Sequence, residues 1–170
     1  MRVSVDKVMS WEPCVEYTLE RVTKLFGKRK TVSALNILDM DIPPEDRLWA
    51  VLHEELIPAP TLHELACRFA ESALRAERKA GRDPDPRSWA AIEAKRAWLR
   101  GEITGKQLSA AESAAESAAW LAARLASESA AESAAWLAAE SAAWSATWSA
   151  TWSAARLAQV EMVREILGER

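Results

Sequence analysis

The chain has 170 residues, of which 49% are apolar and 28% are charged, and its formal net charge is −3. This length is enough for one domain with a core, or for a small domain with an appendage. The first 108 residues hold 18 basic and 17 acidic side chains, so the sequence lacks the basic surface of non-specific nucleic-acid binding. Two cysteines, Cys14 and Cys67, argue against a disulfide scaffold. Because the first nine residues contain no long apolar stretch, we expect a cytoplasmic protein.

The first hundred residues predict short helices separated by Pro and Gly. Pro13 precedes a run of apolar residues with helical spacing, and Gly27 ends it. Thr31 is expected to cap a second short helix, and residues 41–45 to begin a third that ends at Pro58. No segment alternates with the period of a strand, so strands are not expected.

Two longer helices follow. Thr61 and Glu64 have the capping-box pattern at the start of a helix that Gly81 ends. After a polar turn, Asp85 or Ser88 begins the next helix. At the other end of the chain, the first nine residues can form a short extended arm.

A second capping-box pattern, Thr104 with Gln107, follows Gly101 and leads into a four-residue repeat. Between residues 109 and 160 the unit occurs thirteen times, with Ala in second place and Glu, Trp, Arg or Val in fourth. Ala is the best helix former, so we expect helix throughout. A continuous helix of this length would span about 78 Å, which exceeds a compact domain of this size. We therefore expect an interruption, with residues 127–129 the weakest place.

These patterns predict an all-α fold. An N-terminal bundle of short helices over residues 1–103 precedes an Ala/Ser/Trp tetrad-repeat helical region over residues 104–168, the two packed as one unit. The longest uncharged stretch, residues 141–155, is too short and too rich in Ser and Thr to cross a membrane.

Three indoles in the repeat are the candidate binding residues. Trp144, Trp148 and Trp152 are four residues apart, so in a helix they form a ladder that sweeps about 80° with about 6 Å between rungs. Such a ladder can pack on the N-terminal helices or on a second copy of the chain, or it can form a contact surface for a different protein. No Lys-rich face accompanies it, which disfavours a membrane interface.

One dense group of potential metal ligands or catalysts lies outside the repeat. It is centred on His53, His63 and Cys67, and the last two would share a helix face. The spacing is not that of a zinc site, so structural roles are favoured over a metal site or catalysis. The sequence has no Gly-rich phosphate loop and no G-x-S-x-G motif, and we expect neither an enzyme nor a bound cofactor.

One stretch of the chain contains a pattern of residues that is more specific than its overall composition. Its segments are RLWAVL (47–52), EELIP (54–58), LHE (62–64), ACR (66–68), DPDPRS (83–88), AI (91–92) and WLRGE (98–102), followed by the Ala/Trp tetrads. This pattern, over about residues 35–160, resembles a family of bacterial immunity proteins, the immunity-five-like Ala-rich group of polymorphic toxin systems. The resemblance implies a helical, non-enzymatic protein that neutralises a toxin by binding it. The chain departs from the family in its Ser-rich units and in the charges of residues 75–79. A self-associating helical protein, and so a homo-oligomer, is the alternative.

Overall fold

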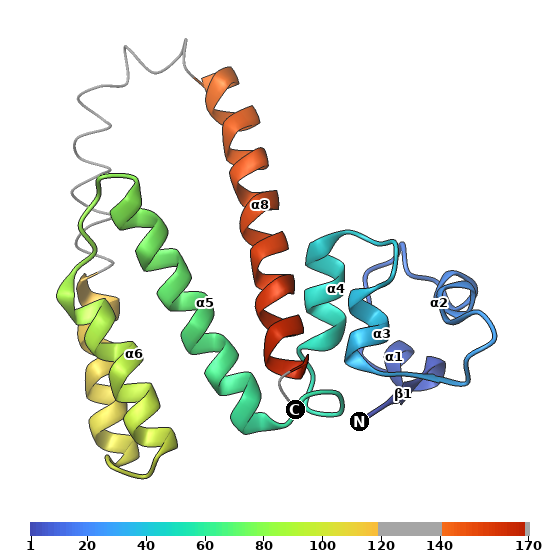
Figure 1. Ribbon diagram of the computed structural model, residues 1–170, viewed down its shortest axis with the longest axis horizontal. Coiled ribbons are helices and arrows are strands. Elements are labelled where there is room, and N and C mark those ends of the chain that lie inside the picture. The colour runs from blue at the N-terminus through green and yellow to red at the C-terminus, as the bar shows by residue number, and fades with distance from the viewer. Residues whose placement is uncertain (119–140, 169–170) are drawn as a thin grey trace. The chain divides into compact units, whose positions relative to one another are not determined.

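The structure is a computed structural model that describes residues 1–118 and 141–168, which are mostly helical (Figure 1). The expected all-α class is confirmed, and both described parts of the repeat are helical. The expected interruption at residues 127–129 lies outside the described residues. The chain divides into two compact units, Met1–Leu62 with Trp152–Arg170 (unit 1) and His63–Thr151 (unit 2). The boundary expected from composition between residues 103 and 104 stays a prediction.

Unit 1 contains one short strand pair, which the sequence analysis did not expect. Strand β1 (Val3–Ser4) pairs antiparallel with β2 (Thr31–Val32), and Val3 lies opposite Val32. Both valines are buried, so the pair is held by a long-range apolar contact that local periodicity does not report. The prediction that Thr31 caps a helix was therefore wrong. The extended arm is limited to the strand, because residues 5–9 form helix α1 (Val5–Met9).

Helix α2 (Leu19–Phe26) begins later than the sequence predicted. Thr18 is its N-cap, and the Thr18 hydroxyl accepts a hydrogen bond from the Arg21 amide. The residues around Pro13 form an irregular loop instead, and Glu12 has a φ of 54°, which no helix accommodates. The stop at Gly27 is confirmed, since Gly27 has a φ of 60° at the C-cap.

The next two helices are short. Helix α3 (Ala34–Leu38) starts at Ser33, whose side chain and that of Asn36 form a capping box. Helix α4 (Pro44–Val51) begins with Pro at its first position. It ends before the expected stop at Pro58, since Leu52 has a non-helical ψ of 47°, and the amides of Leu56 and Ile57 then donate to the carbonyl oxygen of His53 in a separate turn.

The C-terminal part of helix α8 (Ser141–Gly168) completes the core of unit 1. Val160, Val163 and Ile166 are buried there. The Arg164 guanidinium donates hydrogen bonds of 2.7 Å to Asp39 Oδ1 and of 3.1 Å to the Leu38 carbonyl oxygen. The N-terminal elements provide the other large side chains that are fully buried in this unit, which are Val32, Leu38, Val51 and Ile57. Residues from both ends of the chain thus share one core.

Unit 2 contains most of helix α5 (Ala59–Lys79), helix α6 (Pro86–Leu99) and the helical residues 105–118. Helix α5 starts at Ala59, so Thr61 lies inside its first turn and not at an N-cap as predicted. Thr61 is buried, with 3% of its surface exposed. Among the described residues, no helix combines the length and the hydropathy that a membrane span requires.

The other predicted helix boundaries of unit 2 are confirmed. Gly81, with a φ of 81°, follows α5, and Asp85 caps α6 by accepting a hydrogen bond from the Arg87 amide. In the next capping box, the Gln107 amide donates to Thr104 Oγ1, and the Thr104 amide donates to Gln107 Oε1.

We predict that Val163→Ala lowers the free energy of unfolding of unit 1 by about 2 kcal/mol, because it removes buried methyl groups and leaves a cavity. Leu157→Ala, on the same helix, is the matched control. Leu157 is 49% exposed, so its truncation should change stability by less than about 0.5 kcal/mol. Urea unfolding followed by circular dichroism measures both. Equal effects of the two substitutions would contradict the assignment of α8 to the core.

Candidate functional site

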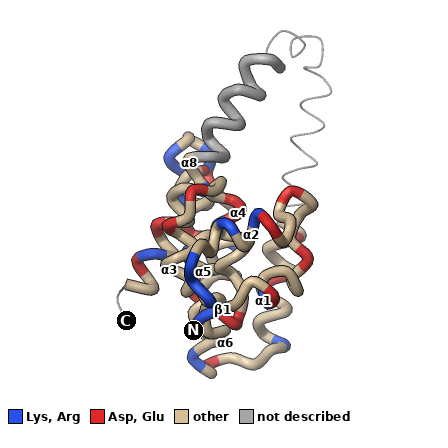
Figure 2. Tube along the Cα trace, turned by 90° about the vertical axis from the view of Figure 1, so that its right-hand side faces the viewer, with Lys and Arg blue, Asp and Glu red and all other residues tan. Residues whose placement is uncertain are grey.

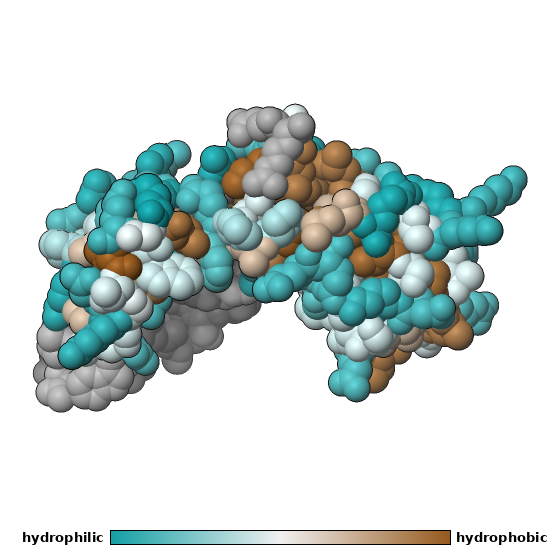
Figure 3. Space-filling model, turned by 90° about the horizontal axis from the view of Figure 1, so that it is seen from below, coloured by the Kyte–Doolittle hydropathy of each residue, from teal (hydrophilic) through white to brown (hydrophobic). Residues whose placement is uncertain are grey.

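An apolar pocket lies among the first four helices of unit 1. Its volume is about 300 Å³. Each helix contributes to the walls, for example through Val8 of α1, Val22 of α2, Ile37 of α3 and Ala50 of α4. In Figure 3, hydrophobic residues reach the surface in several places on the part of the molecule formed by these N-terminal elements. The pocket arises because short helices connected by loops leave space that their side chains do not fill.

The loop between α1 and α2 forms one wall of the pocket through Cys14 and Tyr17. The Tyr17 hydroxyl donates a hydrogen bond of 2.5 Å to Asp46 Oδ2 on α4, which fastens the loop to that helix. The Arg21 guanidinium lies 4.2 Å from the centre of the Tyr17 ring. Burial is the main cause that raises the pKa of Tyr17 well above its usual range, and the hydrogen bond to Asp46 and the charge of Asp46 add to it.

Three side chains combine a place in the pocket wall with exposure to solvent. These are Trp49, which is 41% exposed, and the exposed Cys14 and Glu45. Because the pocket is partly open and carries an aromatic ring and a carboxylate where it meets solvent, a ligand could reach it without unfolding of the unit. Figure 2 shows acidic and basic positions interspersed along the described trace, so the charge at the pocket is local and is not part of a large field.

Trp49 also belongs to an aromatic cluster with Trp11 and His53. The rings of Trp11 and His53 are stacked with their centres 3.8 Å apart, and Trp49 meets both rings edge-on. Burial is the main cause that lowers the pKa of His53. An ion pair of 2.5 Å between Lys7 and Glu55 holds the turn that carries His53 against α1. The cluster thereby supports the wall of the pocket that Trp49 forms.

In the structure, the residues of the predicted group, His53, His63 and Cys67, have packing contacts. His53 stacks in the aromatic cluster, and His63 meets the ring of Trp98 edge-on at 5.9 Å between centres. Cys67 is buried, and burial raises the pKa of its thiol. Among residues 1–118 and 141–168, no three His, Cys, Asp or Glu side chains are placed to hold a metal ion.

The predicted tryptophan ladder lies on α8, which is helical from Ser141 onward. The side chains of Trp144, Trp148 and Trp152 are outside the described part of the structure. The helix that the ladder requires is thus present, and the binding role of the three indoles stays a prediction.

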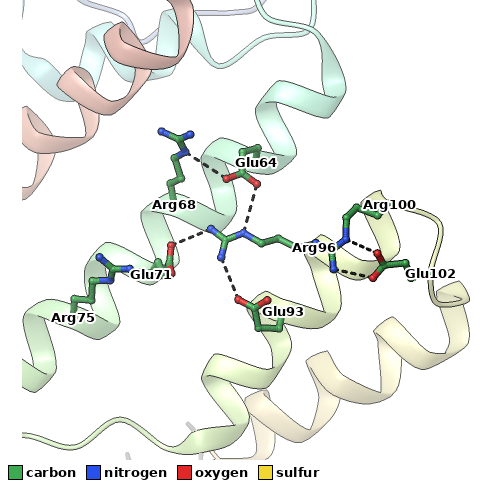
Figure 4. A network of polar contacts seen from close by, with 8 residues as sticks. All are labelled: Glu64, Arg68, Glu71, Arg75, Glu93, Arg96, Arg100 and Glu102. Atoms are coloured by element: carbon green, nitrogen blue, oxygen red, sulfur yellow. Dashed lines mark hydrogen bonds and ion pairs between the residues drawn. The ribbon is translucent and has the colours of Figure 1, made fainter. Parts of the chain in front are cut away.

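Unit 2 is held together by a polar network around Arg96, shown in Figure 4. The Arg96 guanidinium on α6 lies 2.9 Å from Glu71 Oε2 and 3.6 Å from Glu64 Oε2, both on α5, and 3.2 Å from Glu93 Oε1 on its own helix. The Arg96 side chain is only 19% exposed. Because three carboxylates surround this cation, we interpret the network as a link between two helices and not as an anion site.

No family model, curated protein or solved structure matches this chain. The resemblance to immunity proteins therefore stays a prediction. The sequence analysis missed the pocket because its walls come from four helices and from the loops between them, and no motif marks them. The one local signal was the Pro13 region, where a loop replaces the expected helix and supplies Cys14 and Tyr17.

We predict that Arg96→Met lowers the free energy of unfolding by about 1–3 kcal/mol at neutral pH, because it removes the partly buried cation that Glu71 and Glu64 share and leaves them only Arg75 and Arg68 on their own helix. Arg100→Met is the matched control, since Arg100 forms an exposed pair with Glu102 and should cost less than about 0.5 kcal/mol.

The effect of Arg96→Met should also depend on pH. The hydrogen bond from Arg96 lowers the pKa of Glu71, so this contribution is present above the unfolded-state pKa of about 4 and is lost as the pH falls through the folded-state value. Denaturant unfolding should therefore show the difference from the unsubstituted protein shrinking below about pH 4. A difference that stays constant down to full protonation would contradict the ionic role of Arg96.

Tyr17 gives a second test, because it is the only tyrosine of the chain. With its pKa raised, the folded protein should show no tyrosinate absorbance near pH ~10, where an exposed tyrosine titrates. Folding stability should be unaffected by this group below that pH and should fall above it, because only the unfolded chain then loses the proton. In Asp46→Asn the pKa of Tyr17 should move down but remain above its ordinary value. A normal titration of the folded protein would show that the phenol is neither buried nor hydrogen-bonded to Asp46.

Proposed function

We propose that this chain is a non-catalytic protein that binds another protein, and that its partner is the toxin of a polymorphic toxin system, as the family resemblance implies. The observation that supports this proposal is that the repeat is helical in both of its described parts. The tryptophan positions 144, 148 and 152 therefore follow one another along a helix with a constant spacing.

A helix of Ala, Ser and Trp is suited to binding and offers little for catalysis. Successive tryptophan positions advance about 6 Å along the axis and about 40° around it, so they form a nearly continuous row. Each indole can bury roughly 200 Å² of surface, and Trp is the residue type most enriched among those that dominate binding energy. The small Ser, Ala and Thr residues between them allow a facing element to approach closely.

The test is co-expression with the toxin encoded by a neighbouring gene. The chain should relieve toxicity and co-purify with the toxin. The triple variant Trp144→Ala, Trp148→Ala and Trp152→Ala should bind the toxin at least about 100-fold more weakly, because interface tryptophans commonly contribute 2 kcal/mol or more. The matched control is Ser145→Ala, Ser149→Ala and Ser153→Ala, which changes three residues of the same helix and keeps every indole. Circular dichroism verifies that all proteins are equally helical.

Failure of the unsubstituted chain to relieve toxicity or to co-purify would refute the proposed function. Full protection by the tryptophan variant would leave toxin binding intact and would show that the three tryptophans do not form the binding face. Light scattering of the same preparations separates self-association from toxin binding. A dimer that the tryptophan substitutions convert to a monomer would favour the structural alternative.

A further inference from the structure

We propose that the apolar pocket of unit 1 is a binding site for a small apolar ammonium ion, a protonated amine on a short hydrocarbon chain or ring. This site is separate from the repeat residues through which we propose toxin binding. Three properties carry the inference, namely the size and lining of the cavity, the hydrogen-bonding character of its polar groups, and the charge where it opens.

The cavity is too large and too apolar to be a packing defect filled by water. Its volume of about 300 Å³ is bounded mainly by aliphatic and aromatic side chains from α1 to α4 and from the loops that connect these helices. Protein interiors contain few voids larger than a water molecule, and a water needs two to four polar partners to be held. An engineered apolar cavity of about 150 Å³ stays dry and takes up benzene. The hydrocarbon part of a ligand is therefore the natural occupant.

The polar groups of the pocket require a hydrogen-bond donor from the ligand. Tyr17 has one hydroxyl proton, and it is already donated to Asp46. The carboxylates of Asp46 and Glu45 accept hydrogen bonds and donate none when ionised. A ligand with a carboxylate or phosphate head would thus meet two like-charged carboxylates, with the Trp49 indole N–H and the Cys14 thiol as the side-chain donors of the lining, whereas an ammonium group donates three hydrogen bonds.

The charge at the pocket also favours a cation. Glu45 lines the pocket, is exposed, and has no ion-pair partner among the described residues. Trp49 provides an aromatic ring in the same wall, which attracts cations through its π-electrons. Arg21 is a cation in contact with the Tyr17 ring. It is held by the ring of Tyr17 and by the Glu16 carbonyl, and it does not line the pocket.

The test uses three probes with one ring and different heads, cyclohexylmethylamine, cyclohexylmethanol and cyclohexanecarboxylate. Isothermal titration calorimetry of the full chain at neutral pH gives their affinities. The amine should bind at least about tenfold more tightly than the carboxylate, with the alcohol between them. The amine should also slow alkylation of Cys14, whose thiol lines the pocket, while Cys67 is buried and serves as an internal reference.

Two kinds of variant locate the site. Glu45→Gln should weaken amine binding about 3- to 10-fold and leave alcohol binding unchanged, whereas Glu20→Gln, an exposed glutamate of α2 outside the pocket, should change neither. Ala50→Leu fills the cavity and should abolish binding of all three probes. Leu25→Trp fills it from α2 and serves if Ala50→Leu does not fold, as judged by circular dichroism.

The inference is overturned if the amine does not bind, if the carboxylate binds as tightly as the amine, or if both filled variants fold and still bind the probe. The last result would show that the probe binds elsewhere on the chain. Loss of binding in a folded, filled variant together with selective weakening by Glu45→Gln would establish both the site and the preference for a cation.

Discussion

The burial of the C-terminal end of α8 is the contact on which the rest of unit 1 depends. Val160 and Val163 are almost fully buried in unit 1, which combines the end of α8 with the first 62 residues of the chain. Helices α1 to α4 have between five and eight residues each, and helices of that length are not stable alone. They therefore need a surface to pack on, and a core shared with the end of a 28-residue helix provides one.

The two units are held together by different interactions. In unit 1, apolar side chains from distant segments meet, but the short helices do not fill the space between them, and the pocket remains. In unit 2 few large side chains are buried among the described residues, Leu65, Ile92 and Leu108 among them. There Arg96 supplies a link between α5 and α6 through Glu64 and Glu71. The first arrangement leaves room for a ligand, whereas in the second the charge of Arg96 is balanced by the carboxylates around it.

Local signals in the sequence predicted the helix ends that depend on one or two neighbouring residues. The stops at Gly27 and Gly81, the cap at Asp85 and the capping box at Thr104 were predicted correctly, because each of these uses a side chain or a backbone angle within a few positions. The strand at Thr31 could not be predicted, since its partner is 27 residues away in sequence at Ser4. Propensity does not report such a contact.

The candidate site could not be predicted from the sequence for the same reason. Val8, Val22, Ile37 and Ala50 are ordinary apolar residues in their own helices, and only their meeting creates a cavity. The residues that the sequence suggested as metal ligands or catalysts make packing contacts in the structure. His53 and His63 were singled out as potential ligands, and each has an aromatic ring as its neighbour. Tyr17 carried no motif, yet its hydrogen bond to Asp46 shapes the pocket wall.

Amide hydrogen exchange of the full chain tests the central claim most directly. If the end of α8 belongs to the core of unit 1, the amides of Val160, Val163 and Ile166 open only with the whole unit. They should then show the same free energy of opening as those of Leu38 and Val51. If the amides near the end of α8 exchange like a frayed terminus while Leu38 and Val51 remain protected, the two ends of the chain do not share a core and the account fails.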